Sequence, residues 1–226
     1  MYFLIRCPLY NKGGTFLNKL EEIENSKVPK GHVTLVGFGR LGLRTGINLT
    51  QIHRGGPKKI VVIDGQKISD GDIIFKMKGG KIGDYKVDLL KEFKGIKDVF
   101  PVKEDITPEN LDLVEGDVVS IQIAGGDTLE TTAMIIKKAQ EIGAKTISTA
   151  GVFGIGDEKI EVMDISEAST DNPIVKELNE YGINSEHKII TTGKFIEDDV
   201  PITPYVLDEL ANITTKEILK SLNGWK

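Results

Sequence analysis

The sequence predicts an α/β fold with a mostly parallel sheet and helices on both faces. Short β-branched runs of buried-strand length alternate with helix-compatible stretches along most of the chain. The connections between them are short, and parallel strands joined through a helix form right-handed crossovers. A glycine-rich turn, Gly37-x-Gly39-x-x-Gly42, follows the first such strand and opens a helix. Together these observations predict a Rossmann-like core.

Each element of the first half follows from local pattern. In the N-terminal segment 1–31, Phe16, Leu20 and Ile23 fall at helical spacing, which predicts a short amphipathic helix. A strand–helix–strand unit comes next: a strand at His32–Val36, a helix running to Gln51 and a strand at Lys58–Asp64. The core then continues with a helix, two strands, a helix and a strand: Val87–Phe93, Asp98–Val102, Asp117–Ile123, Thr128–Gly143 and Lys145–Ser148.

After Gly151 the alternation becomes less regular. We expect strands at Lys159–Met163 and Lys188–Thr192, a helix at Pro173–Tyr181 and a closing helix at Val206–Leu222 that packs back on the sheet. The chain is therefore divided into the segment 1–31, a nucleotide-binding core at 32–151 and a C-terminal strand and helix extension at 152–226. We expect this extension to form part of the substrate pocket and of dimer contacts.

Composition excludes several classes of protein. The 226 residues are 39% hydrophobic and 28% charged, which is typical of a globular domain. A net charge of −5 argues against nonspecific binding to nucleic acid or membranes, and no apolar stretch approaches the roughly 20 residues of a membrane helix. The single cysteine, Cys7, rules out an intrachain disulfide and a cysteine-based zinc site. We expect a cytoplasmic protein.

The glycine turn has the context of a nucleotide-binding loop. Gly37 permits the tight turn, Gly39 lets a phosphate approach the backbone, and Gly42 allows close packing of helix and strand. Amides at the start of the helix would then hold phosphate oxygens. Asp64 closes the second strand, where an acid can accept hydrogen bonds from ribose hydroxyls. A purely structural turn is the simpler alternative, and the loop alone does not distinguish NAD, FAD and ATP.

Three downstream features favour ATP. Lys86 lies at the start of the helix after the second strand, where its ammonium group would reach a triphosphate. Asp127 follows the strand at Asp117–Ile123, where an acid can hold Mg²⁺, although a helix N-cap is the better explanation for this residue taken alone. The polar loop from Asp64 to Asp72 is long for a connection of this kind.

These features, in this order and spacing, resemble the ThiF/MoeB/HesA adenylyltransferases, which are related to ubiquitin-activating enzymes. The resemblance extends over roughly residues 31–150 and, more loosely, over Val200–Pro204 and the closing helix. It implies that the acid at Asp64 binds the ATP ribose, that Lys86 contacts phosphate and that Asp127 binds Mg²⁺. Gln66 of the polar loop joins the cofactor-binding set. The resemblance also implies a homodimer that adenylates a carboxylate and releases pyrophosphate.

The sequence departs from this family at several positions. The polar loop of the family runs on to Asn, Arg and Gln, and the matching residues here are Asp72, Phe75 and Lys76. The arginine is therefore missing, and Arg40 or Lys76 is our candidate to replace its charge in catalysis. Paired CxxC motifs are absent, and no cysteine follows the nucleotide-binding core, so no acyl thioester can form there. A partner protein carrying a thiol would have to accept the acyl group.

This chain is compact and lacks both the zinc motifs and the thioester cysteine. In these respects it resembles the branch of the family that acts in biosynthesis of the guanylylpyridinol cofactor of methanogen [Fe]-hydrogenase. That resemblance implies a pyridinol carboxylate as substrate. We place the substrate pocket beside the loop Thr149–Gly154, with Thr191, Thr192 and Lys194 as candidate carboxylate ligands or as ordinary polar strand residues. The alternatives are an NAD(P)-dependent oxidoreductase and a non-catalytic nucleotide-binding protein.

Overall fold

A twisted seven-stranded sheet forms the centre of the computed structural model, which describes residues 15–53, 55–124 and 126–223. The strand order is β3-β2-β1-β4-β5-β7-β6, and neighbouring strands are parallel except that β6 runs antiparallel to β7. The strands are β1 (His32–Val36), β2 (Lys59–Ile63), β3 (Asp98–Val102), β4 (Val118–Ile121), β5 (Lys145–Thr149), β6 (Glu161–Asp164) and β7 (His187–Thr191). The predicted α/β fold is confirmed.

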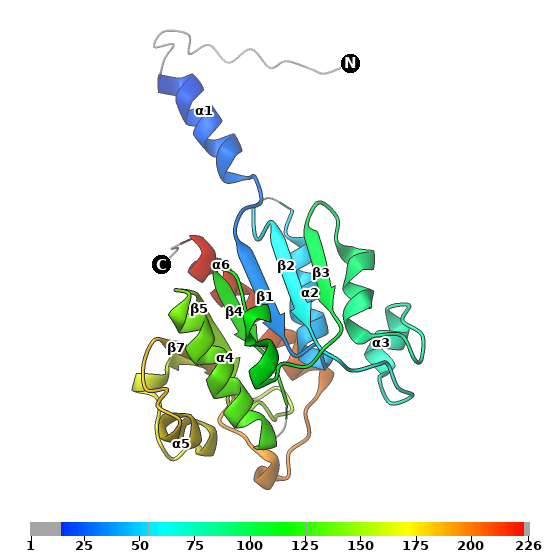
Figure 1. Ribbon diagram of the computed structural model, residues 1–226, viewed down its shortest axis with the longest axis vertical. Coiled ribbons are helices and arrows are strands. Elements are labelled where there is room, and N and C mark those ends of the chain that lie inside the picture. The colour runs from blue at the N-terminus through cyan, green and yellow to red at the C-terminus, as the bar shows by residue number, and fades with distance from the viewer. Residues whose placement is uncertain (1–14, 54, 125, 224–226) are drawn as a thin grey trace.

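Helices cover both faces of the sheet. The long helices α2 and α6 pack against each other on one face, whereas α4 and α5 pack together on the other, with α4 in front of the sheet in Figure 1. The α-helices are α1 (Thr15–Ser26), α2 (Arg40–Gln51), α3 (Ile73–Met77), α4 (Leu129–Glu141), α5 (Pro173–Glu180) and α6 (Pro204–Asn223). The 3₁₀ helices are η1 (Lys86–Phe93), η2 (Pro108–Leu113), η3 (Gly126–Thr128), η4 (Ile165–Glu167) and η5 (Ile196–Asp198).

Side chains of the central strands alternate between two hydrophobic clusters. In β2, Ile60 and Val62 belong to the cluster under α2 and α6, and Val61 and Ile63 belong to the cluster under α4. All four are buried because a parallel sheet is covered on both faces. This double burial explains why these strands read as continuous apolar runs in the sequence.

The N-terminal helix is set apart from this body. Figure 1 shows α1 projecting away from the sheet beyond the amino end of β1. This is the helix that the sequence predicts from the spacing of Phe16, Leu20 and Ile23. Leu20 and Ile23 are exposed on it. Cys7 lies outside the described residues. Among the helices that the structure describes, none has the length and apolar character needed to cross a membrane.

Two local features add to the prediction. The helix predicted at Val87–Phe93 is present as the 3₁₀ helix η1, Lys86–Phe93. A short helix that was not predicted, α3, follows the polar loop, and its five residues Ile73–Met77 are too few to give a periodic signal. The closing helix packs on the sheet through β4 and β5, as expected. The region after Gly151 contributes β6 and β7 to the same sheet, with β7 next to β5.

The strand order places one crevice at the middle of the sheet. The chain leaves β1 to one side for β2 and later returns on the other side with β4. The loops after β1 and β4 therefore diverge at the carboxyl ends of these strands. Ligands of open α/β sheets bind at such a switch point. The glycine turn and η3 both lie there.

Candidate nucleotide-binding site

Three glycines shape the turn between β1 and α2, each for a different reason. Gly37 has a positive φ of 89°, and a Cβ atom there would lie 2.7 Å from the carbonyl oxygen of Gln122. A Cβ atom on Gly42 would lie 2.3 Å from the carbonyl oxygen of Gly37. At Gly39 a Cβ atom would meet no atom within 4 Å, so its free side faces open space. Two glycines close the turn, and the third leaves the start of α2 accessible.

The carboxylate of Asp64 connects the glycine turn to the polar loop. Its Oδ2 accepts a hydrogen bond of 2.6 Å from the Phe38 amide, and its Oδ1 accepts one of 2.7 Å from the Gln66 amide. Burial raises the pKa of Asp64, while these two hydrogen bonds and the nearby charge of Lys86 oppose the increase. Asp64 thus links the glycine turn to the polar loop through two backbone hydrogen bonds.

Lys86 lies buried next to this acid at the start of η1. Its Nζ donates to Oε1 of Gln66 at 2.8 Å, lies 3.3 Å from Oδ1 of Asp72 and sits 5.4 Å from the centroid of the Phe75 ring. Phe75 in turn packs edge-on against Phe38 of the glycine turn. The structure therefore brings Asp64, Gln66 and Lys86 close together, and their role in binding a cofactor stays a prediction.

Asp127 lies on η3 at the other side of the crevice. Its side chain is exposed and forms no hydrogen bond or ion pair with another described residue. No group of three or more acidic, histidine or cysteine side chains in the described part of the chain is arranged to hold a metal ion. Mg²⁺ that arrives with a nucleotide needs only one or two carboxylates, because phosphate oxygens and water complete its shell. Asp127 fits that kind of site.

The two candidate replacements for the missing arginine have different surroundings. Lys76 donates to Asp70 at the surface, through the carbonyl oxygen at 2.6 Å and Oδ1 at 2.9 Å. Arg40 is exposed at the first residue of α2, and its guanidinium group forms no ion pair with another described residue. Phe75 occupies the matching position itself and is buried in the core. Of the two, Arg40 is the cation that adjoins Gly39.

The predicted substrate loop is held by two threonines. The hydroxyl groups of Thr191 and Thr192 both donate to the carbonyl oxygen of Gly151, and Thr192 also donates to that of Phe153 at 2.7 Å. Lys194 lies 4.0 Å from Asp198. The threonines thus fix the loop after β5, and the alternative that they are polar strand residues describes them better than a carboxylate-binding role.

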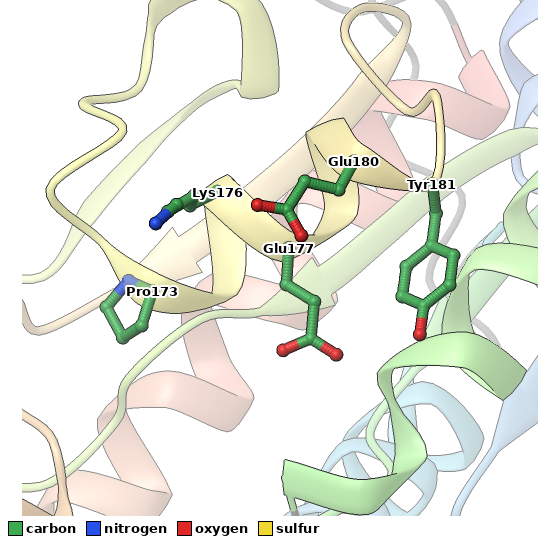
Figure 2. Close-up of a pocket in the computed structure, with 5 residues that line it drawn as sticks. All are labelled: Pro173, Lys176, Glu177, Glu180 and Tyr181. Carbon is green, nitrogen blue, oxygen red and sulfur yellow. The ribbon is translucent and has the colours of Figure 1, made fainter.

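Two surface hollows accompany the fold. A groove of about 840 Å³ runs between α2, α3 and α6, and Arg40 lies at one of its walls. A hollow on α5 is lined by Pro173, Lys176, Glu177, Glu180 and Tyr181, whose side chains come from one helix and its end (Figure 2). None of the predicted site residues lines the hollow on α5. The site is therefore defined by the loops at the switch point.

One residue of the site was missed by sequence reasoning. The sequence marks Asp72 only as a departure from the family, whereas in the structure its Oδ1 lies 3.3 Å from Nζ of the buried Lys86. The Ser-x-x-Asp spacing at 69–72 was the available signal, since that pattern marks reciprocal hydrogen bonds at a helix start. Here Oδ2 of Asp72 accepts from both the amide and the hydroxyl group of Ser69.

The chemistry of this arrangement suits a nucleoside triphosphate. Free amides of the first turn of α2, an accessible Gly39, a buried ammonium group and an exposed carboxylate surround the crevice. The first three attract phosphate, and the fourth suits a divalent cation bound to that phosphate. Within the described residues we find no Tyr-x-x-x-Lys pair at the crevice of the kind used for hydride chemistry.

Comparisons with known proteins identify a relative by sequence. No protein-family model matches the chain. It is 47% identical over 221 residues to the uncharacterized protein MJ0693 of Methanocaldococcus jannaschii, covering 98% of this chain and 88% of that one.

Solved structures give the most informative matches. HcgE from Methanothermobacter marburgensis, determined with guanylylpyridinol and ATP bound, has 54% identity and a TM-score of 0.85, and the match covers 89% of this chain and 99% of that one. The Escherichia coli tRNA N6-threonylcarbamoyladenosine dehydratase TcdA, determined with AMP, has 18% identity and a TM-score of 0.74 over 94% of this chain and 93% of that one. The second likeness concerns the fold.

Proposed function

The chain belongs to the family of HcgE, among the ThiF/MoeB/HesA-type adenylyltransferases, and on that premise we propose that it activates a carboxylate as an acyl-adenylate. ATP would be the nucleotide, carried with Mg²⁺, and pyrophosphate the leaving group. The observation that supports this most directly is the position of Lys86. Its buried ammonium group lies over the ring of Phe75, which packs against Phe38 of the glycine turn, so we expect it to meet a phosphate chain held on the first turn of α2.

The proposed substrate is the pyridinol carboxylate of the guanylylpyridinol cofactor precursor. HcgE is seen with guanylylpyridinol and ATP together, and it is 54% identical to this chain over the 89% of the chain that the match covers. The loop at Thr149–Gly154, fixed by Thr191 and Thr192, provides one wall near the carboxyl edge of β5. A carboxylate is ionised near neutral pH, so the reaction needs no general base.

The proposed step is an in-line displacement at the α-phosphorus of ATP. A carboxylate oxygen forms the new bond, the bond from the α-phosphorus to the bridging oxygen breaks, and pyrophosphate leaves with the electron pair. Lys86 and the amides of the glycine turn hold the phosphates, and Asp64 orients the ribose. Arg40 adds positive charge at the same helix start. Asp127 would hold Mg²⁺, which neutralises charge on the phosphate oxygens.

The later fate of the acyl group lies outside this chain in our proposal. No cysteine follows Cys7 in the sequence, so an acyl thioester would form on a thiol of a partner protein. The family resemblance supports a homodimer as the working unit. Hydride transfer with NAD(P) is the rival activity, and it would explain the glycine turn and Asp64 but neither the buried Lys86 nor the exposed Asp127.

Two measurements test the proposal. Titration calorimetry should give heat of binding with ATP and with AMP and none with NAD. Exchange of labelled pyrophosphate into ATP should then depend on the added carboxylate, with guanylylpyridinol compared against simple pyridine carboxylates. Tight NAD binding without ATP binding would support the oxidoreductase instead. ATP binding without exchange for any carboxylate would support a non-catalytic nucleotide-binding protein.

A further inference from the structure

Lys86 is buried at an unusual cost for a lysine, and its contacts show how the fold offsets it. Only 9% of its side chain is exposed. A buried ammonium group is unfavourable unless hydrogen bonds and an opposite charge compensate it. Gln66 supplies one acceptor at 2.8 Å, but its amide oxygen carries no net charge. The negative charge in direct contact with Nζ comes from Asp72, at 3.3 Å.

Asp72 is itself held in place. The side chain is 14% exposed, and Oδ2 accepts hydrogen bonds from the amide of Ser69 at 2.9 Å and from its hydroxyl group at 2.8 Å. These two bonds leave Oδ1 directed at Lys86. Burial raises the pKa of Asp72, but the bonds from Ser69 and the charge of Lys86 outweigh burial, so its pKa lies below the ordinary value. Asp72 is therefore an anion at neutral pH.

Phe75 adds a second constraint on the position of the Lys86 ammonium group, beside its ion pair with Asp72. The ring fills the position that carries an arginine in the resembling family, and Nζ of Lys86 lies over its face. Attraction between a cation and a ring face depends on where the cation sits. Where the resembling family has an arginine, this chain has the aromatic ring of Phe75. Together with the carboxylate of Asp72, this ring fixes the position of Lys86.

We propose that Asp72 is a positioning residue that holds the ammonium group of Lys86 where it meets the triphosphate. This inference rests on the proposed function, because it takes Lys86 to be a phosphate ligand. Asp72 itself does not contact the nucleotide. It acts through Lys86, because a lysine ordered before binding loses less side-chain freedom when ATP arrives.

The chain offers a matched control in the same loop. Asp70 pairs with Lys76 at 2.9 Å, but Asp70 is 94% exposed. An exposed pair of this kind contributes little, whereas truncating one partner of a buried pair is costly. Asp70→Asn therefore removes the same charge from the same loop without disturbing Lys86.

The test is a double-mutant cycle on the dissociation constant for ATP, measured by calorimetry. Asp72→Asn keeps an oxygen for Ser69 and removes the charge, and we expect it to weaken ATP binding by at least about tenfold. In a Lys86→Met background the same substitution should change binding by less than about twofold, since its effect passes through Lys86. Asp70→Asn should leave binding unchanged, and Asp72→Glu should recover part of the loss.

Each other outcome overturns the inference. Unchanged or tighter ATP binding in Asp72→Asn would show that Asp72 does not position Lys86, and an equal loss in both backgrounds would show that it acts through the fold alone. Thermal unfolding of every variant identifies a general loss of structure. Because the readout is binding, wild-type protein that binds ATP but exchanges no pyrophosphate would overturn adenylation while the cycle still decides the role of Asp72. Wild-type protein that binds no ATP would overturn both.

Discussion

The backbone amide of Phe38 donates a 2.6 Å hydrogen bond to Oδ2 of Asp64, so the acid that ends β2 holds the glycine turn that follows β1. The other oxygen, Oδ1, accepts from the amide of Gln66 at 2.7 Å. One buried carboxylate therefore satisfies two backbone donors from loops that are far apart in the sequence. Its loss should disturb the conformation of the site even in the absence of nucleotide.

Asp64→Ala should lower the free energy of unfolding by about 2 kcal/mol or more, because it leaves two backbone donors without an acceptor. Urea denaturation followed by circular dichroism measures the change. Asp84→Ala is the matched control, because that exposed carboxylate accepts only a long bond of 3.3 Å from the Lys81 amide. Equal stability of the two variants would mean that the Phe38 and Gln66 amides find other acceptors.

Gly39→Ala should separate binding from stability. The added methyl group meets nothing within 4 Å, and the backbone φ of −75° suits alanine. We expect the free energy of unfolding to fall by no more than about 1 kcal/mol, because Gly39 is the N-cap of α2, where alanine is less favourable than glycine. ATP binding should weaken at least tenfold, because the methyl group occupies the open side where phosphate approaches the backbone.

Gly71→Ala controls for the glycine itself, since a Cβ atom there also meets nothing within 4 Å. It lies in the polar loop, and ATP binding should stay at the wild-type level. Gly42→Ala should instead destabilise the fold, because its methyl group would lie 2.3 Å from the carbonyl oxygen of Gly37. Full ATP affinity in Gly39→Ala would place the phosphates elsewhere.

Asp127→Asn should reduce pyrophosphate exchange about 100-fold while leaving stability unchanged, because the exposed carboxylate forms no hydrogen bond or ion pair with another described residue. The loss should appear in the magnesium dependence: ATP binding without the metal should be similar in variant and wild type. Glu130→Gln, an exposed acid in the first turn of α4, serves as the charge-matched control. Wild-type exchange in Asp127→Asn would exclude it as the metal ligand.

His187 should make the fold sensitive to mild acid. It is buried between Ser148 and Thr146, with Nε2 2.8 Å from one hydroxyl oxygen and Nδ1 2.9 Å from the other. Burial lowers the pKa of His187 from 6.5 to about 4, against the opposing charge of Asp164. The unfolded chain therefore binds a proton that the folded chain excludes. The contribution of His187 to the free energy of unfolding is fully present above pH 6.5 and is lost as the pH falls toward 4.

The loss over that range should reach about 3 kcal/mol, because each difference of one in pKa corresponds to about 1.4 kcal/mol. Urea unfolding at several pH values between 7.5 and 4.5 measures it. His187→Gln should be less stable at pH 7.5 but should show a flatter dependence on pH, since glutamine does not titrate. Parallel curves for variant and wild type would assign the acid sensitivity to other groups.

Most of the sheet could be predicted from the sequence because its determinants are local. The run His32–Val36 matches β1 at both ends, and Asp98–Val102 does the same for β3. In β1, burial on both faces leaves a run with a clear start and end, whereas β3 lies at the edge of the sheet and is partly exposed. Gly37 and Gly42 can be predicted for a similar reason, since each has its own steric requirement within the turn, whereas Gly39 meets no atom of the protein and is explained only by the expected approach of a phosphate.

The interior of the polar loop could not be read in this way. The pairing of Asp72 with Lys86 depends on α3, a helix too short to leave a periodic signal, turning Phe75 into the core. Thr191 and Thr192 were ambiguous because a hydroxyl group can serve a ligand or a loop carbonyl, and only the folded path of residues 151–153 decides between them. In both cases the deciding contact joins segments that are distant in sequence.

The packing of α6 on α2 has a consequence for the order in which the protein forms during synthesis. The helix that begins at the glycine turn is covered by Pro204–Asn223, which follows every other described element along the chain. Strands β1, β2 and β3 can assemble early, but Leu43 and Ile47 of α2 keep an uncovered apolar surface until α6 emerges from the ribosome. A chain stalled before residue 204 would expose that surface to chaperones and to aggregation.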